Sequence, residues 1–200
     1  MPKYVAFLRA INVGGHTVKM DDLRRLFEAM GFSNVETFIA SGNFIFDSTS
    51  KSPKALEKKI EGHLRAALGY EVATFIRSMS ELAEIAQYKP FADAELNAPG
   101  NTVYIAFVAD RPGDAAKQKL RSFTTKFDEF HVNGREVYWL CRKKMSESEF
   151  SGAVMLGLLA FISIQLNLAD APMLLPEICP LTNAHSSVIL PAADQALQGV

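Results

Sequence analysis

Two short polar stretches, far apart in the sequence, hold the residue types that could bind an anion. The first stretch holds Arg9, Asn12, Gly14, Gly15, His16 and Lys19, and the second is Ser41-Gly42-Asn43. Glycines let a ligand approach the backbone closely, while Arg9 and Lys19 supply positive charge. A helix beginning near Met20 would add the unpaired N–H groups and positive dipole end of its first turn. These residues predict a small site for a phosphate or carboxylate group.

The glycine spacing in the first stretch matches no nucleotide-binding motif. Neither GxGxxG nor GxxxxGK[ST] is present, so neither a dinucleotide nor a nucleoside-triphosphate loop is predicted. In the alternative interpretation the glycines form a tight turn, Asn12 binds the loop backbone, and Ser41-Gly42-Asn43 only turns a hairpin. The residue types fit both interpretations.

Other catalytic arrangements find little support in the sequence. Asp21 and Asp22 are acid-base candidates, but acids in a first helical turn are typical of a dipole interaction. No GxSxG or other nucleophile elbow is present. The four histidines show no HExxH or Cys/His spacing, so neither a metal nor a cofactor is expected; they are His16, His63, His131 and His185. His16 alone falls in the candidate loop, where it could donate a proton or simply be exposed.

Cys141 is the cysteine with a chemically suggestive neighbourhood. It precedes Arg142-Lys143-Lys144, whose charge could lower the pKa of the thiol. The sequence offers no base or oxyanion partner for it. We therefore interpret Cys141 as a packing residue.

Hydrophobic periodicity predicts the elements that would position the two candidate stretches. A strand is expected over 3–9, and a helix over 20–30 that Gly31 ends. The next expected elements are strands over 35–40 and 44–47 around Ser41-Gly42-Asn43, a helix from Pro53 to Leu68 that Gly69 ends, and a strand over 71–77. In this βαββαβ order, the loop after the first strand and the hairpin emerge at the same end of the sheet. We therefore expect the candidate residues to face one another there.

The pattern begins again after a helical linker over 80–100. Tyr104-Ile105-Ala106-Phe107-Val108 echoes Tyr4-Val5-Ala6-Phe7-Leu8 at an offset of one hundred residues. A helix over 115–123 and two strands joined at Asn133-Gly134 come next, and a third helix is expected after Ser146. The sequence thus predicts an α+β fold of two tandem ferredoxin-like (βαββαβ) subdomains over 1–79 and 101–156, the second incomplete at its C-terminus.

Several features predict a soluble, cytoplasmic protein. Lys3 and Arg9 leave no room for the apolar core of a signal peptide. The longest apolar stretch, 153–164, is shorter than the ~18 residues of a membrane span. The two cysteines form no CxxC motif and fit a reducing compartment. The oligomeric state stays open.

One ordered set of residues carries a family resemblance. It comprises Leu8-Arg9-Ala10-Ile11-Asn12-Val13-Gly14-Gly15-His16, Met20, Leu23, Gly31-Phe32, Val35, Thr37 and Ser41-Gly42-Asn43, with Val137-Tyr138-Trp139 and Met145-Ser146-Glu147-Ser148 as a weaker second part. This set resembles the signature of the domain of unknown function 1697 (DUF1697) family, with Ala10 in place of the usual glycine. The resemblance implies paired ferredoxin-like subdomains and no established activity.

The segment 157–200 departs from that resemblance. The family's second lobe ends with a Thr-Arg-Asn type strand and a short basic helix, and nothing after Leu156 matches them. All 21 basic residues but only 17 of the 22 acidic ones lie at or before Lys144, so residues 1–144 carry a net charge of +4 and residues 145–200 carry −5. This atypical tail is either divergent or translated from a shifted reading frame.

Two other functions are alternatives to anion binding. A nucleic-acid-binding sheet would use exposed aromatics, for which Phe44 and Phe46 alternate suitably on the third strand. The RNP1 pattern is missing, however, and strand aromatics are more often buried under helices. The remaining alternative is a protein-interaction module.

Overall fold

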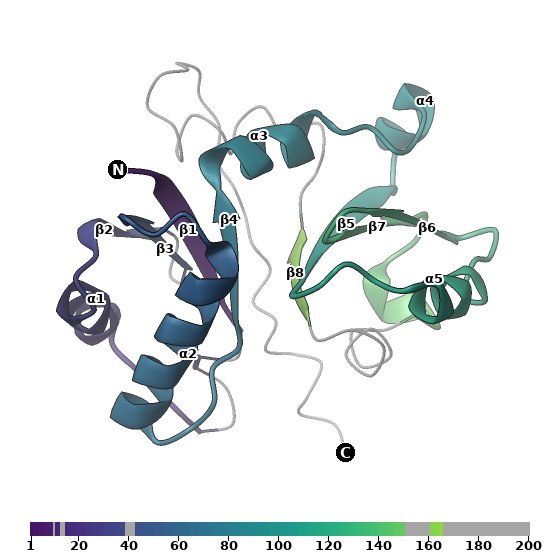
Figure 1. Ribbon diagram of the computed structural model, residues 1–200. Coiled ribbons are helices and arrows are strands. Elements are labelled where there is room, and N and C mark those ends of the chain that lie inside the picture. The colour runs from purple at the N-terminus through teal and green to yellow at the C-terminus, as the bar shows by residue number, and fades with distance from the viewer. Residues whose placement is uncertain (10, 13–14, 39–42, 151–160, 166–200) are drawn as a thin grey trace. The chain divides into compact units, whose positions relative to one another are not determined.

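The structure is a computed structural model that describes residues 1–9, 11–12, 15–38, 43–150 and 161–165, the last of these as backbone only. Its elements are β1 (Lys3–Leu8), α1 (Met20–Ala29), β2 (Ser33–Phe38), β3 (Asn43–Asp47), α2 (Pro53–Leu68), β4 (Thr74–Ser78), α3 (Met79–Gln87), α4 (Asp93–Leu96), β5 (Thr102–Val108), α5 (Asp114–Arg121), β6 (Asp128–Asn133), β7 (Glu136–Cys141), the short 3-10 helix η1 (Met145–Glu147) and β8 (Phe161–Gln165) (Figure 1). They form a mixed α+β fold with two antiparallel sheets. The described residues divide into a first unit up to Leu82 and a second unit from Ala83.

The first unit contains a four-stranded sheet in the order β2-β3-β1-β4. Its central strand β1 is antiparallel to both neighbours, with Tyr4 opposite Phe46 on one side and opposite Ser78 on the other. Its apolar residues from Tyr4 to Leu8 are all buried, so the side chains on both faces of this strand are covered. The strand expected over 3–9 is thus confirmed over Lys3–Leu8.

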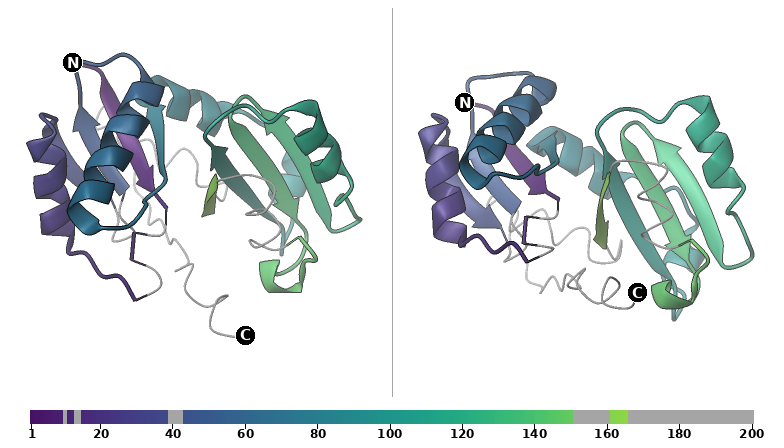
Figure 2. Two further views of the ribbon diagram at one scale, coloured as in Figure 1. Left: turned by 60° about the horizontal axis from the view of Figure 1, so that its bottom comes forward. Right: turned by 90° about the horizontal axis from the view of Figure 1, so that it is seen from below.

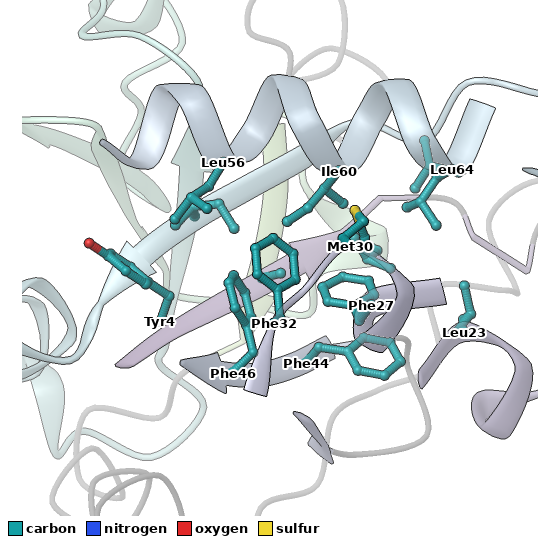
Figure 3. Packing of buried hydrophobic residues seen from close by; sticks show 14 of the residues in the cluster. Tyr4, Leu23, Phe27, Met30, Phe32, Phe44, Phe46, Leu56, Ile60 and Leu64 are labelled. Atoms are coloured by element: carbon teal, nitrogen blue, oxygen red, sulfur yellow. The ribbon is translucent and has the colours of Figure 1, made fainter. Parts of the chain in front are cut away.

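Helices α1 and α2 lie together on one face of the first sheet (Figure 2). Leu23 and Phe27 of α1 share a core with Leu56, Ile60 and Leu64 of α2. These positions recur every three or four residues, so each helix directs one apolar stripe toward the sheet. The packing of this core is drawn in Figure 3.

Aromatic rings from β3 fill the centre of that core (Figure 3). Phe44 stacks on Phe27 with ring centroids 4.5 Å apart, and Phe46 lies 4.4 Å from Phe32. Both strand phenylalanines are fully buried, and burying a side chain of this size contributes about 1.5–3 kcal/mol. The hypothesis that Phe44 and Phe46 stack nucleic-acid bases is therefore wrong, because helices cover their face of the sheet.

Helix α2 begins and ends at residues that local chemistry selects. The Ser52 hydroxyl accepts a hydrogen bond from the Ala55 amide at 3.3 Å, and Pro53 occupies the first turn. At the other end Gly69 adopts a left-handed φ of +82° and its amide donates to the Arg65 carbonyl. A residue with a Cβ is strained in this conformation, which explains why the helix stops there.

Two carboxylates of α2 cover the edge of strand β4. Glu57 accepts a hydrogen bond from the Ile76 amide at 3.1 Å, and Glu61 accepts one from the Thr74 amide at 3.0 Å. Those amides point away from β1, where an edge strand leaves its donors unpaired. The helix therefore both packs on the sheet and satisfies its edge.

The second unit contains a sheet in the order β6-β7-β5-β8. Strand β5 is central here, antiparallel to β7 and to β8. Strand β8 lies within 157–200, the segment that the sequence set apart as an atypical tail. The second sheet thus extends past residue 156. A third helix is expected after Ser146. The structure has the short helix η1 (Met145–Glu147) there, and residues 151–160 lie outside the described ranges.

The segment predicted as a helical linker packs largely with the second unit. Its helix α3 begins with a capping box, in which the Ser78 hydroxyl accepts from the Glu81 amide and Glu81 accepts from the Ser78 amide. Further along, the Tyr88 hydroxyl lies 2.5 Å from Nε2 of His131 in β6. Among the helices in the described ranges, none is long and apolar enough to cross a membrane.

Candidate functional site

Strand β1 ends where strand β3 begins, which places Arg9 and Asn43 at one end of the first sheet. Asn43 pairs with Phe7 in the register of β1 and β3. The Arg9 amide donates to the Ala73 carbonyl at 2.9 Å, so the pairing of β1 with β4 continues one residue past Leu8. Side chains alternate along a strand, and cross-strand partners share a face. Arg9 and Asn43 therefore lie on the same face, opposite to the one that α1 and α2 cover.

Two positive charges border this end of the sheet. Arg9 is half-buried as a residue, and its side chain forms neither an ion pair nor a hydrogen bond with any residue that the structure describes. The Lys19 ammonium is exposed and likewise has no partner in the described ranges. The Lys19 backbone begins α1, since its carbonyl accepts from the amides of Asp22 and Leu23.

Asn12 closes the loop that comes after β1. Its Oδ1 accepts a hydrogen bond from the Val18 amide at 2.7 Å. This contact is the one expected if Asn12 shapes the loop backbone. It occupies the carbonyl oxygen of the side chain and leaves the Nδ2 amide group as the donor for a ligand.

His16 packs against a residue that the sequence did not single out. Its ring is stacked on that of Tyr70, with centroids 3.9 Å apart and an interplanar angle of 20°. The Tyr70 hydroxyl donates to the carbonyl of the buried Ile11 at 2.8 Å, and burial raises the pKa of Tyr70. In the sequence, the one sign that Tyr70 could hold this loop is its position as an aromatic residue directly after Gly69, the residue that ends α2.

The remaining candidates of the two stretches are glycines and a serine. Gly15 has a φ of +85° with open space around its Cα, so its conformation rather than crowding requires glycine. Gly14, Ser41 and Gly42 lie outside the described residues.

The two acids at the start of α1 form local ion pairs. Asp21 lies 3.1 Å from Arg24, and Asp22 lies 3.5 Å from Arg25. All four side chains are well exposed. These contacts fit the interpretation of the two acids as helix-end residues rather than as a catalytic pair.

Cys141 is buried in the second unit, and burial raises the pKa of its thiol. The lowered pKa considered from the neighbouring basic residues is therefore wrong. The thiol donates to the Lys143 carbonyl at 3.1 Å. Arg142, its nearest basic neighbour, is instead hydrogen-bonded to Glu95 and Glu129. Cys141 accordingly packs in the core, which confirms the interpretation made from its lack of a base or oxyanion partner.

Two parts of the family-like second stretch meet at one buried carboxylate. Asp128 accepts hydrogen bonds from Nε1 of Trp139 at 2.9 Å and from the Ser148 hydroxyl at 2.8 Å. The network satisfies the carboxylate and ties the segment after β7 to the start of β6. In the part of the chain that the structure describes, no group of three His, Cys, Asp or Glu side chains could hold a metal ion.

Comparisons with known proteins identify a family and a fold. The model of a family described as "Protein of unknown function (DUF1697)" matches residues 1–138. Among solved structures, the conserved bacterial protein SP0830 from Streptococcus pneumoniae matches with a TM-score of 0.70 and 18% sequence identity, over 88% of this chain and 98% of that chain. At this identity the likeness shows the fold alone. No curated protein matches the chain.

Proposed function

Because the chain belongs to the DUF1697 family of proteins of unknown function, we propose a function from its own residues. The protein binds a small ligand that carries a phosphate or carboxylate group. The ligand's anionic end lies at the end of the first sheet, between the loop after β1 and the start of β3. Arg9 is its principal contact.

The observation that carries this proposal is that Arg9, a half-buried residue, has no carboxylate partner among the described residues. A charge partly withdrawn from water is stabilised by a counter-charge, and burial without one is unfavourable. The planar guanidinium can donate two parallel hydrogen bonds to a carboxylate or phosphate. An anionic ligand would supply the missing partner.

Neighbouring residues support the same chemistry. Asn43 shares the face of Arg9 and is buried, so it could orient a ligand from the β3 side. Lys19 adds a second charge at the start of α1, whose first amides favour an anion. Asn12 contributes its Nδ2 group. The proposed site is completed by the remaining candidates Gly14, Gly15, His16, Ser41 and Gly42.

We also propose that the two units are tandem ferredoxin-like subdomains of a cytoplasmic protein. The first covers 1–79, a linker covers 80–100, and the second covers 101–156 and extends further to include β8. The equivalent strand orders β2-β3-β1-β4 and β6-β7-β5-β8 support the repeat. So does the placement of Tyr4 opposite Phe46 and of Tyr104 opposite Trp139 on the central strands. The unpaired thiol of Cys141 fits a reducing compartment.

A thermal-shift screen of the intact protein against phosphorylated and carboxylated metabolites tests the ligand proposal. A ligand at one hundred times its Kd stabilises the folded state by about 2.7 kcal/mol, which raises the Tm of a protein this size by about 5–10 °C. Arg9→Ala should abolish the shift, and Arg9→Lys should restore part of it. The control is Arg111→Ala, which removes an exposed arginine of the second unit.

Three results would contradict the proposal. One is a screen in which no anion raises the Tm. Another is an equal shift in the parent protein and in Arg9→Ala. A third is a shift produced only by oligonucleotides or only by added proteins, which would favour the nucleic-acid or protein-interaction alternative.

A further inference from the structure

An exposed aromatic ring lies among lysines at one end of the second sheet. We call this surface the Phe127 patch; it consists of Lys126, Phe127, Lys143, Lys144 and Met145. The end of β7 and the start of β6 bring its two segments together, because Asp128 pairs with Cys141. The Arg142 amide donates to the Phe127 carbonyl at 2.8 Å, and this hydrogen bond holds the backbone of Phe127 beside the basic segment 142–144.

Two ammonium groups of the patch lie over the Phe127 ring. Nζ of Lys126 and Nζ of Lys143 are each 4.8 Å from the centroid of the Phe127 ring. Phe127 is 38% exposed and Met145 is 41% exposed, and Met1 is the one other large apolar side chain that is exposed in the described ranges. Cations at this distance from a ring are attracted to its face.

The lysines of the patch have no acidic partners within the described part of the chain. Lys126, Lys143 and Lys144 form no ion pair there, whereas Arg142 neutralises Glu95 and Glu129. Asp128 is buried and hydrogen-bonded to Trp139, so it does not reach the surface. The result is two ammonium groups over one ring and a third lysine beside Lys143 in the sequence, with no carboxylate at ion-pair distance from them in the described ranges.

We propose that the Phe127 patch binds single-stranded nucleic acid. A base stacks on the Phe127 ring, which every base can do through its π-face, and the lysines contact the phosphates on either side. The ammonium that a stacking base displaces needs to move only to the neighbouring phosphate. This places the aromatic contact in the second unit, on an exposed ring, rather than on the buried rings of β3.

The two ammonium groups over the ring favour a nucleic acid over a membrane surface. Inserting Phe127 into the hydrocarbon region would carry two ammonium groups with it, since both lie 4.8 Å from the ring centroid, and burying unpaired charges is costly. In a nucleic acid, bases and phosphates alternate along the strand. A ring bordered by cations complements that alternation.

Fluorescence anisotropy of the intact protein with a labelled twelve-nucleotide oligo(dT) tests the proposal. Neutralising three phosphates gives a salt slope of about −2, so raising NaCl from about 50 to about 200 mM should weaken binding about 20-fold. Phe127→Leu keeps the apolar bulk but removes the ring, and binding should weaken about fivefold or more. The triple variant Lys126→Ala/Lys143→Ala/Lys144→Ala should lose binding and flatten the salt dependence.

A second triple variant, Lys51→Ala/Lys58→Ala/Arg111→Ala, removes the same charge from exposed positions elsewhere and should bind as the parent protein does. Fluorescence of Trp139, the one tryptophan in the chain, checks that each variant is folded. Absence of binding by the parent at about 100 μM protein would overturn the proposal. Equal losses in the two triple variants would also overturn it, as would binding to phosphatidylcholine–phosphatidylserine vesicles without binding to the oligonucleotide.

Discussion

The ring of Tyr70 holds the loop after β1 by stacking on His16, at 3.9 Å between centroids, while its hydroxyl donates to the carbonyl of Ile11. These two contacts join the segment directly after α2 to both ends of the segment 11–16. Ordering a loop costs conformational entropy, and these two contacts offset that cost by attaching the loop to the end of α2. The conformation in which the loop presents its polar residues depends on this attachment.

Replacing Tyr70 should therefore loosen the loop before it weakens the sheet. Tyr70→Phe keeps the ring stack but removes the hydroxyl, so the free energy of unfolding should fall by about 1 kcal/mol. Tyr70→Ala should cost more because it also removes the stack. Hydrogen exchange should show faster exchange over 11–19 in both variants, with β5 and β7 unchanged. Uniformly faster exchange would argue against a local role.

The side chain of Asn12 should act through its oxygen. Asn12→Asp retains an acceptor for the Val18 amide and should leave stability within about 0.5 kcal/mol of the parent. Asn12→Ala removes the acceptor and should cost about 1 kcal/mol. Urea denaturation compares the two variants. Equal destabilisation by both would contradict the hydrogen bond. If Nδ2 contacts the ligand, both variants should lose ligand binding, because neither carries that group.

Glu57 should stabilise the fold mainly as a hydrogen-bond acceptor rather than through its negative charge. Glu57→Gln keeps an acceptor for the Ile76 amide and should be tolerated, whereas Glu57→Ala leaves that amide unpaired and should cost about 1–3 kcal/mol. Lys58→Ala on the exposed face of α2 is the matched control and should change little. Chemical denaturation is the measurement. Equal stability of Glu57→Ala and Lys58→Ala would remove this role.

The buried thiol of Cys141 should make stability depend on pH in the alkaline range. Burial raises the pKa of this thiol in the folded state. As the pH rises, the thiol of the unfolded chain, with a pKa of about 8.5, therefore loses its proton before the thiol of the folded protein does. Its contribution to stability is therefore complete below about pH 8.5 and is lost as the pH rises through the native pKa. Denaturation of Cys141→Ala at neutral and alkaline pH should show a smaller loss than the parent. An identical loss in both proteins would refute the assignment.

Much of the first unit can be predicted from local signals in the sequence. Helix α2 has the predicted limits because Pro53 and Gly69 act on their own backbone. Strand β4 begins at Thr74 rather than at the predicted residue 71, because its start is set by pairing with the end of β1. Pairing across the sheet depends on residues distant in sequence, which periodicity does not detect.

Less of the candidate site than of the fold can be predicted from local sequence signals. The positions of Arg9 and Asn43 can be inferred from strand order, but the stack of His16 on Tyr70 joins residues that share no sequence pattern. Helix α4 has only four residues, too few for a periodic signal. Strand β8 pairs with β5 although the family-like stretch ends before it.

The late position of β8 has a consequence for synthesis on the ribosome. All four strands of the first sheet are present once Ser78 has been translated. In the second sheet, β5 has only one of its two neighbouring strands until β8 (Phe161–Gln165) has been synthesised. Until then one side of β5 is an unpaired edge, which can pair with another chain. A nascent chain that stalls in this interval would combine a finished first half with an open strand, and it would be the species most in need of a chaperone.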